Sequence, residues 1–417
     1  MPTLNTCRRR RLWRDRAGSV LAITAAALPL LIGAAGLAVD TVQWTYWRRQ
    51  LQREADSAAL AGAFAKAQGR DAVVAASSEL LRTNVILLAS SPDIRSAPTV
   101  GAFAGNSQAV RVSIQTSRRL PFSGTFMSAA PVISAQATAA VLSNGTYCAL
   151  ALGSSSAVGI KMQGSASLDF GCGLATNSRA ANAVTAGGSA SITATPVAAV
   201  GGLSASNNYT GETRLLPYSL PQPDPYGQLA NPVLPGCSGP VNVGPHGDQT
   251  LTSGGCYRGM DIKGTLRLAA GTYYIDGSSF SVGSQGTIIG DNVTIILTSS
   301  TAATDPSSIA TLNINAGATV QLTAPTTGIY NGILFYQDRR ALDSGTNQIN
   351  GNATSSLHGA FYFPSQELAF SGTSGMTADC LQLVAIRLTF VGNTSVSNHC
   401  DVGGGSAFTG VQVRLVE

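Results

Sequence analysis

Three aspartates at equal spacing are the first residues in this chain whose pattern could support chemistry. Asp261, Asp276 and Asp291 follow one another at the same interval. If the chain coils with that repeat, their carboxylates would align along one ridge and could bind calcium or polarise a glycosidic oxygen. The three residues also stand in sequences typical of turns, because Asp tolerates the backbone angles of corners. We expect the turn role for all three.

A charge cluster in the second half of the chain is the best candidate for an enzymatic site. It contains Asp338, Arg339, Arg340 and Asp343. A polysaccharide lyase needs a base close to a cation, and this segment offers both groups. The alternative is a solvated loop, which is the commoner fate of such a cluster. We expect the loop.

Other catalytic and metal-binding patterns are absent from the sequence. His246, His358 and His399 are far apart, and none has an acid or nucleophile at a recognisable motif spacing. The sequence contains no G-x-S-x-G, Walker loop or H-E-x-x-H motif. It therefore predicts a protein that is not an enzyme, with no cofactor and no metal site.

Six of the seven cysteines lie in the second part of the chain and form three sequence-local couples. We expect disulfides between Cys148 and Cys172, Cys237 and Cys256, and Cys380 and Cys400. An even cysteine count is typical of a disulfide framework in an oxidising compartment. Six cysteines allow 15 pairings, so the connectivity stays open at this point.

Only 11% of the residues are charged, and Gly, Ser, Thr, Asn and Ala dominate the second half. Such a chain exposes hydroxyl and amide groups, which favours regular β-structure with polar ladders over helical bundles. The signature of disorder, low hydrophobicity with high net charge, is absent. The one basic run, at Arg8 to Arg11, lies beside an apolar segment and does not indicate nucleic-acid binding.

The apolar segment from residue 17 to residue 39 contains no charged residue. A helix of this length is about 34 Å long and can cross the hydrocarbon core of a bilayer. Positive flanks stay on the cytoplasmic side, so a basic tail at residues 1–16 predicts a cytoplasmic N-terminus and an outward-facing body. The topology signal consists of Arg8, Arg9, Arg10, Arg11, Arg14 and Arg16. A cleavable signal peptide is the alternative interpretation.

The helix is predicted to continue beyond the membrane. Apolar and small residues recur at steps of three and four after Thr41, which indicates a helical stripe. We expect this stripe, and two acidic residues near it, to contact partner helices. The residues concerned are Asp40, Trp44, Trp47, Leu51, Ala55, Asp56 and Ala58.

Residues 15–65 also carry a recognisable combination of features. An uncharged helix containing Gly18, Pro29, Gly33 and Gly36 ends in Val-Asp, and an L-Q-x-x-A-D-x-A-A-L-A tail follows. This combination resembles the N-terminal segment of TadG-like proteins of the Flp (tight adherence) pilus-assembly system. The resemblance implies a single-pass membrane protein of a pilus or secretion apparatus, with pilins, pseudopilins and other assembly proteins as partners.

Many TadG-like proteins also carry a D-x-S-x-S metal-ion-dependent adhesion site. The nearest string here begins at Asp276 and departs from that pattern at its fifth position, Phe280. We therefore do not expect that site in this chain.

Residues 40–145 are expected to form a helical extension and a small pilin-like α/β region. A second amphipathic helix is predicted from Ala72 to about Leu88, followed by strands at residues 109–116, 120–127 and 132–142. The alternative for these strands is a connector sheet unrelated to pilins.

Residues 146–417 change in texture to short apolar runs separated by Gly, Asn and Ser. We expect coils of roughly 15 to 25 residues that stack into a parallel β-helix, with a β-sandwich as the alternative fold. The Pro-rich passage at residues 216–236 is predicted to be an extended surface excursion or a strap.

The fold class is therefore mixed: a transmembrane helix, a pilin-like α/β region and a β-rich body. We expect an inner-membrane, single-pass, non-enzymatic component of Flp/Tad pilus assembly, which acts as a scaffold or as an adhesive, minor pilin-like subunit. Its body would be periplasmic or surface-exposed, and its partners would include membrane lipid. The alternatives are a surface β-helix enzyme acting on polysaccharide and an adhesin that works independently of pili.

Overall fold

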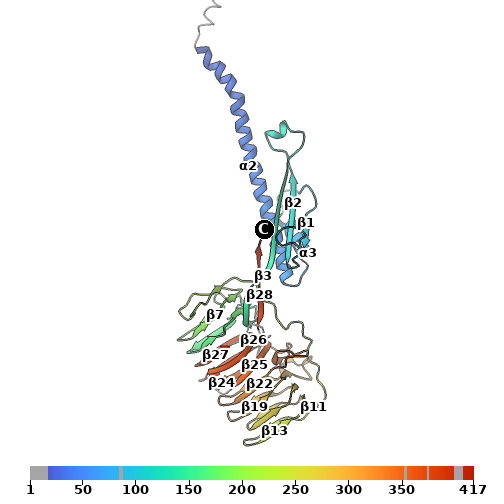
Figure 1. Cartoon of the computed structure of the whole chain (residues 1–417), viewed down its shortest axis with the longest axis vertical. Coiled ribbons are helices and arrows are strands. Elements are labelled where there is room, and N and C mark those ends of the chain that lie inside the picture. The colour runs from blue at the N-terminus through green and yellow to red at the C-terminus, as the bar shows by residue number, and fades with distance from the viewer. Residues whose placement is uncertain (1–16, 84–87, 352–354, 373–374, 399–406) are drawn as a thin grey trace, which may run out of the picture. The chain divides into compact units, whose positions relative to one another are not determined.

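The computed structural model describes residues 17–83, 88–351, 355–372, 375–398 and 407–417 (Figure 1). The chain divides into two compact units. Unit 1 comprises Met1–Leu142 together with Val413–Glu417, and unit 2 comprises Ser143–Gln412. The chain thus leaves unit 1 through one strand, builds all of unit 2, and returns to unit 1 for its last few residues.

Helix α2 (Ala17–Ala67) runs through 51 residues (Figure 1). Its first half exposes large apolar side chains, such as Leu21 at 77% and Val42 at 70%. Among the described residues, α2 is the one helix long and apolar enough to cross a membrane. This agrees with the prediction of a single apolar N-terminal helix that continues beyond its apolar stretch.

Local signals end α2 and start the next helix. Gly69 adopts a φ of 67°, a left-handed conformation that glycine adopts without a steric penalty, and its N–H donates to the carbonyl of Lys66. Asp71 then accepts hydrogen bonds from the N–H groups of Val73 and Val74 at 2.8 and 3.0 Å. This cap begins α3 (Ala72–Thr83), a helix that the sequence predicts.

Unit 1 packs α2 and α3 against an antiparallel sheet of β1 (Asp93–Ser96), β2 (Ala109–Ser117) and the first part of β3 (Val132–Ala151). Its core combines small residues of the helices with larger residues of the strands. The buried members are Leu51, Ala55, Ala58, Ala59, Ala63, Ala72, Ala76, Leu80, Val110, Val112, Ile114, Ile133, Ala135, Ala137 and Ala139. The last residue of the chain extends this sheet, because the N–H of Thr138 donates to the carbonyl of Glu417 at 2.9 Å.

The strand predicted at residues 120–127 is wrong. This stretch is the loop between β2 and β3 and contains a short 3-10 helix, η1 (Ser123–Thr125). Two of its N–H groups, those of Phe122 and Ser123, donate to the carboxylate of Asp40. Pro121 has no N–H to offer a neighbouring strand. The backbone partners that a strand would use are therefore replaced by a side chain of α2.

Unit 2 is a large domain of parallel strands arranged in three columns. Most strands pair with the strand three places later in the chain, for example β14 with β17 at Gly255 and Tyr273, and β17 with β20 at Tyr273 and Ile295. Such parallel pairing does not agree with the alternative of an antiparallel sandwich. The long strands β25 (Ser356–Gly372) and β26 (Gly375–Gly392) take part in all three columns.

The columns are defined by their strands. Column 1 contains β10 (Leu215–Leu216), β9 (Val197–Ala199), β6 (Gly173–Thr176), the end of β3, β26, β25, β23 (Ile333–Gln337), β20 (Val293–Thr298), β17 (Gly271–Asp276), β14 (Gly255–Tyr257) and β11 (Cys237–Ser238). Column 2 contains β7 (Val184–Ala186), β4 (Ile160–Gly164), β26, β25, β24 (Thr346–Gly351), β21 (Thr311–Ile314), β18 (Ser279–Val282), β15 (Met260–Ile262) and β12 (Val241–Val243). Column 3 contains β8 (Ser191–Thr193), β5 (Ser167–Asp169), β27 (Ser395–Asn398), β26, β25, β22 (Thr319–Thr323), β19 (Thr287–Gly290), β16 (Thr265–Leu268) and β13 (Asp248–Leu251). Outside the columns lie η2 (Pro306–Ser308) and β28 (Phe408–Leu415).

The order of strands in the stack differs from their order in the chain. In Figure 1 the green strands near β7 lie beside the red β26 and β27, and the yellow β13 lies at the other end. The late strand β26 pairs in parallel with the early strands β3 and β4, at Leu383 with Ala149 and Leu388 with Ile160. The chain therefore builds one end of the stack first, crosses to the opposite end, and closes back on its own beginning.

The Pro-rich passage makes that crossing. Column 1 has ten steps between β10 and β11, or about 48 Å at a strand spacing of about 4.8 Å. The passage from Leu216 to Cys237 can span about 65 Å in a polyproline conformation, so it is long enough. We call residues 217–236 the strap.

The strap covers the outer side of column 1. Its Tyr226 and Leu229 pack against buried residues of that column, among them Tyr336 and Tyr362. Two central strands of column 1, β20 (VTIILT) and β23 (ILFYQ), are buried at every residue and therefore on both faces. Strands of column 2 such as β18 instead alternate between buried and half-buried residues.

Candidate membrane and assembly site

The three equally spaced aspartates do not align. Asp261 lies in column 2 opposite Ser281, and Asp276 lies in column 1 opposite Thr298. Asp291 lies in the turn after β19, a strand of column 3. In column 1 Gly255 lies beside Tyr273 and Tyr273 beside Ile295, so neighbouring strands are farther apart in the sequence than successive aspartates are. The three carboxylates therefore do not form the ridge that their equal spacing in the sequence would allow.

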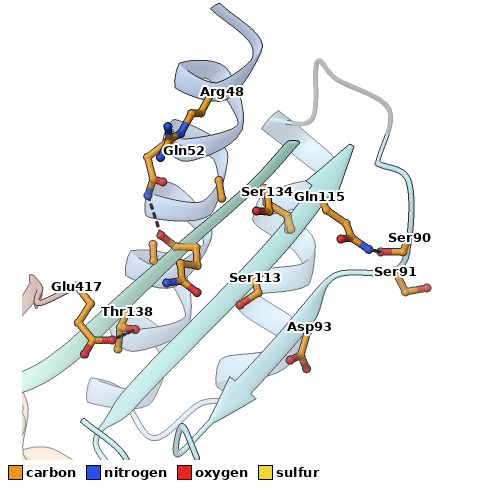
Figure 2. A pocket seen from close by; sticks show the side chains of 14 residues that line it. Arg48, Gln52, Ser90, Ser91, Asp93, Ser113, Gln115, Ser134, Thr138 and Glu417 are labelled. Carbon is orange, nitrogen blue, oxygen red and sulfur yellow. Dashed lines mark hydrogen bonds between the residues drawn. The ribbon is translucent and has the colours of Figure 1, made fainter. Parts of the chain in front are cut away.

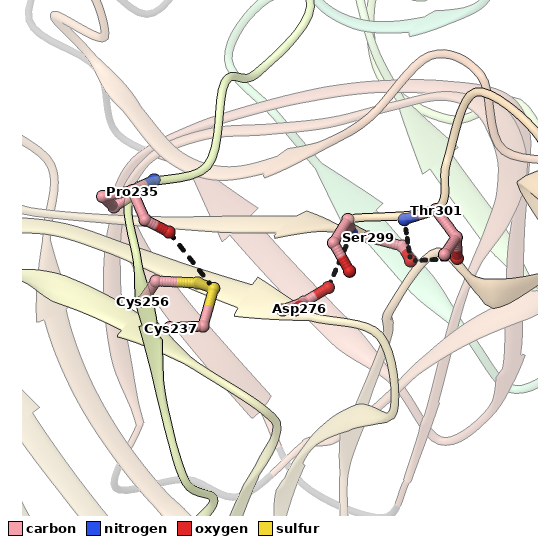
Figure 3. The surroundings of a disulfide bond; sticks show 7 residues. Pro235, Cys237, Cys256, Asp276, Ser299 and Thr301 are labelled. Carbon is pink, nitrogen blue, oxygen red and sulfur yellow. Dashed lines mark hydrogen bonds between the residues drawn. A yellow bond between two sulfur atoms is a disulfide. The ribbon is translucent and has the colours of Figure 1, made fainter.

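Each of the three aspartates has a local partner instead. Asp261 pairs with Lys263 at 2.9 Å, and Asp276 accepts a hydrogen bond from the N–H of Ser300 at 2.6 Å (Figure 3 shows Asp276). Asp291 accepts one from the hydroxyl of Thr323 at 3.0 Å. Among the described residues, no group of three or more His, Cys, Asp or Glu side chains is placed to hold a metal ion.

The charge cluster after β23 lies in a loop, as expected, but the loop is only partly solvated: Asp338 is buried, Arg339 and Arg340 are half-buried, and Asp343 is exposed. Asp338 is fully buried, and its carboxylate accepts hydrogen bonds from the hydroxyl of Thr298 at 2.7 Å and from Arg340 at 2.5 Å. Burial raises the pKa of Asp338, but these hydrogen bonds outweigh it and hold the pKa below its ordinary value of 3.8. A carboxylate with this pKa is a poor general base.

Arg339 binds the strap. Its guanidinium donates to the carbonyls of Tyr226 and Gly227 at 2.9 and 2.8 Å, and to the hydroxyl of Tyr362 at 3.1 Å. That hydroxyl in turn donates to Asp224, also in the strap, at 2.7 Å. Burial raises the pKa of Tyr362, and the Asp224 carboxylate raises it further, so the phenol stays protonated as a donor. This network fixes the strap to column 1.

The fourth residue of the cluster is used elsewhere. Asp343 pairs with Arg387 at 2.5 Å, and Arg387 also reaches Glu367 at 3.5 Å. Asp338 and Arg340 therefore pair with each other, whereas Arg339 and Asp343 contact other segments of unit 2. In the described part of this cluster, every charged group has a partner.

Two of the three predicted disulfides are present in the structure. Cys148 is bonded to Cys172, which joins β3 to the start of β6, and Cys237 is bonded to Cys256. Figure 3 shows the second bond, whose two cysteines are direct neighbours in the register of β11 and β14. It closes the end of the stack where the strap arrives.

Some predicted residues lie outside the described residues. For the couple Cys380 and Cys400, these are Cys400 and the side chain of Cys380, so this pairing stays a prediction. His399 and the six topology arginines also lie outside the described part of the chain.

The predicted partner stripe is largely used inside unit 1. Leu51, Ala55 and Ala58 are fully buried against α3 and the sheet, so they do not face a partner helix. The periodicity correctly indicates a helix face, but that face packs against the chain's own strands. Sequence alone does not tell these two uses apart, because both need the same stripe.

The polar and aromatic residues of the predicted stripe have different surroundings. Asp40 is 4% exposed and binds the β2–β3 loop, while Asp56 accepts a hydrogen bond from Gln52 at 2.8 Å. Trp44 and Trp47 are half-buried, with the guanidinium of Arg48 5.4 Å from the Trp44 ring centroid. Asp56, Trp44 and Trp47 are thus the members of the set with exposed surface.

A polar groove of about 710 Å³ is lined by residues of α2 and of the sheet of unit 1 (Figure 2). Gln52 bridges its two sides by donating to the carbonyl of Gln136 at 2.8 Å. The other lining residues are Arg48, Ser90, Ser91, Asp93, Ser113, Ile114, Gln115, Ser134, Ala135, Ala137, Thr138 and Glu417. This lining contains no His or Cys; it can form hydrogen bonds but offers no nucleophile paired with a base.

This groove was not predicted from the sequence. The period-2 alternation of β2 was its only signal, because the alternation places Ser113 and Gln115 on the face opposite the core. The contribution of Glu417 has no local signal, since this residue is far from β2 and β3 in the chain.

Comparison with known families addresses the N-terminal half of unit 1. Residues 18–68 match the family model Tad, described as Putative Flp pilus-assembly TadE/G-like. No curated protein and no solved structure matches the chain. The match covers nearly all of α2, including both its exposed apolar part and its buried part, and it confirms the resemblance inferred from the sequence. Residues 18–68 are therefore a TadE/G-like segment of the Flp pilus-assembly type.

Proposed function

We propose that this protein is a membrane-anchored, non-enzymatic component of an Flp/Tad pilus-assembly machine. The observation that carries the proposal is the match of residues 18–68 to the TadE/G-like family, on a helix that exposes its apolar first part and buries its second part in a folded unit. A continuous helix of this kind couples a folded unit to the bilayer without a flexible linker.

We further propose that unit 2 is a parallel β-helix that acts as a scaffold or adhesive body, and that unit 1 is pilin-like. Support for the β-helix comes from three columns of parallel strands with a continuous apolar interior. The disulfides and the predicted topology arginines support an inner-membrane protein whose body faces an oxidising, periplasmic or surface compartment.

Partner contacts are proposed for the exposed side chains of α2. With Leu51, Ala55 and Ala58 buried, the available surface consists of the apolar stretch between Val20 and Val42, followed by the exposed parts of Trp44, Trp47 and Asp56. Helices of pilins or pseudopilins could pack against the apolar stretch between Val20 and Val42 within the bilayer.

Replacement of unit 2 in cells that assemble Flp pili tests the proposal. Simple truncation after residue 142 would also delete Val413–Glu417, which belong to unit 1. The side chain of Gln412 donates to the carbonyl of Ser143 at 3.1 Å, so a short Gly-Ser linker can join Leu142 to Val413. We expect gene deletion to abolish pili and surface attachment.

The linker variant distinguishes the two roles of unit 2. Pili without attachment would identify an adhesive body, and absence of pili would identify a scaffold. Unchanged pili and attachment in the deletion strain would contradict the proposal. Release of oligosaccharides from polysaccharide by the purified full chain would instead favour the enzymatic alternative.

A further inference from the structure

The loop between β2 and β3, residues 118–131, lies along α2 at the level of the apolar stretch. Arg118 sits over the ring of Trp47, with 5.9 Å from its guanidinium carbon to the ring centroid. Further along the loop, the N–H of Phe122 donates to Asp40 at 2.8 Å. Asp40 precedes Trp47 by about two turns of α2, so the loop reaches about 10 Å along the helix toward its N-terminus.

The tip of this loop packs directly on the helix backbone. A Cβ atom at Gly36 would clash with the Phe122 ring, so the glycine is what allows the ring to approach. Gly36 lies among the exposed apolar residues of α2, which include Leu37 at 57%, Val39 at 55% and Val42 at 70%. The loop therefore occupies the same axial range as side chains that face a bilayer.

Two large apolar residues of the loop have no cover in the described structure. Phe126 is 77% exposed and Met127 is 48% exposed. The Phe126 ring stacks edge-to-face on Phe122, with 5.4 Å between centroids, so it is held beside α2. Exposed apolar groups next to a membrane-spanning segment are stabilised by contact with acyl chains.

Charged groups support the same placement. Asp40 is the only charged residue between Ala17 and Trp47, and an ionised carboxylate at that depth is costly unless it is hydrogen-bonded. The loop supplies the N–H groups of Phe122 and Ser123 to it. At the base of the loop, Arg118 is half-buried beside Trp47, and the next residue, Arg119, is exposed. At this level of the helix their guanidinium groups would meet lipid phosphates.

We propose that the β2–β3 loop is a second membrane-contacting element, in which Phe126 and Met127 insert into the leaflet beside α2 and Arg118 and Arg119 contact lipid phosphates. The occupant of this apolar surface is the bilayer itself, because the surface is continuous with the exposed apolar stretch of α2. Two contacts, one helix and one loop, would restrict how unit 1 tilts on the membrane. The inference rests on α2 being the membrane anchor.

Spin labels on the full chain in phosphatidylethanolamine and phosphatidylglycerol vesicles test the proposal. A nitroxide is placed at Phe126→Cys in a Cys7→Ser background, with Cys7→Ser alone as the labelling control. Its collision rates with oxygen, which concentrates in lipid, and with a water-soluble nickel chelate are compared. Leu28→Cys serves as the reference inside the bilayer and Ser107→Cys as the reference in water.

We expect the label at Phe126 to favour oxygen over nickel several-fold, like the label at Leu28 and unlike the label at Ser107. Nickel access equal to that at Ser107 would overturn the loop insertion, and shielding from both reagents would overturn it in favour of a protein contact. Nickel access at Leu28 would overturn the anchor as well, so failures of the two assignments are distinguishable.

A pair of glycine variants tests the seating of the loop. Gly36→Leu should displace Phe122 and raise nickel access at residue 126 several-fold. Gly33→Leu is the matched control, because a Cβ there meets no atom within 4 Å. Equal access in both variants would contradict the contact between the loop and the helix.

Discussion

The two units fill their cores in opposite ways. Unit 1 brings α2 close to its partners with small residues such as Ala55, Ala58 and Ala59, all of them fully buried. Unit 2 fills the space between its columns with large rings, such as Phe280, Phe335 and Phe361. Unit 1 should therefore tolerate added side-chain volume poorly, whereas unit 2 should tolerate deleted side-chain volume poorly.

The two units nevertheless share one device. Each holds an irregular segment in place with a buried carboxylate or a partly buried cation, namely Asp40 for the β2–β3 loop and Arg339 for the strap. Because loops lack ladder hydrogen bonds, their backbone groups need such partners when they lie against a core. In both units, therefore, the buried or half-buried charged group fixes an irregular segment against the core.

The largest effect is expected from Phe361→Ala in unit 2. Its ring lies 4.9 Å from that of Phe335, edge-to-face, and is fully buried. Its removal should lower the free energy of unfolding of unit 2 by about 3–5 kcal/mol. Hydrogen exchange of unit 2 peptides measures this, with Phe361→Leu as a control that keeps most of the volume. Similar small effects for both variants would remove the contrast between the two cores.

Asp338→Asn should cost unit 2 about 3 kcal/mol, because Arg340 loses its partner. The folded pKa of Asp338 is depressed, so its stabilisation is present above pH 3.8 and is lost as the pH falls below that value. The free energy of unfolding of the wild type, measured with urea, should fall as the pH is lowered through this range. That of Asp338→Asn should not contain the part of the fall that comes from residue 338. Asp343→Asn, in the more exposed pair with Arg387, is the control and should cost at most about 1 kcal/mol.

Ala58→Leu should destabilise unit 1 by about 1–3 kcal/mol, because α2 has no room for a larger side chain there. All three tryptophans, Trp13, Trp44 and Trp47, belong to unit 1, so tryptophan fluorescence reports on its unfolding and not on that of unit 2. Val74→Leu, at an exposed position of α3, is the control and should change stability by less than about 0.5 kcal/mol. A shift of equal size in both variants would contradict close packing at Ala58.

The smallest effect concerns Glu79, which ties α3 to α2. The hydroxyl of Ser57 donates to its carboxylate at 2.5 Å, and with Arg82 it lowers the pKa of Glu79 below 4.5. The resulting stabilisation, about 0.5–1 kcal/mol, should be present above the ordinary pKa of the group and disappear as the pH falls below it.

Variants of Ser57 and Arg82 show which of these two donors lowers the pKa of Glu79 more. Ser57→Ala should raise the pKa of Glu79 more than Arg82→Gln does, because the Arg82 side chain is 73% exposed and its charge is screened. NMR titration of the Glu79 side chain measures both shifts. The reverse order would show that charge, and not the hydroxyl, sets this pKa.

Features with local causes could be predicted from the sequence. The end of α2 and the start of α3 follow from Gly69 and Asp71, whose conformational and capping preferences act over a few residues. The cysteine couples Cys148–Cys172 and Cys237–Cys256 were also predictable, because strands that follow one another closely in the chain pair and bring sequence-local cysteines together.

Features that depend on residues far apart in the chain could not be predicted from the sequence. The partner of Phe122 is Asp40, far earlier in the chain, so the local pattern at 120–127 wrongly predicts a strand. Asp261, Asp276 and Asp291 fail to align because neighbouring strands of a column are farther apart in the sequence than successive aspartates are. That separation depends on the register between strands, which no single segment determines.

Composition and short-range periodicity were enough to predict the apolar N-terminal stretch, its continuation as one helix, the TadE/G-like segment and a strand-rich body. They did not predict that β26 closes on β3, that the strap crosses the stack, or that Leu51, Ala55 and Ala58 face the interior. The physical reason is that a hydrophobic stripe or a strand edge specifies what it must contact, but not which distant part of the chain supplies the contact.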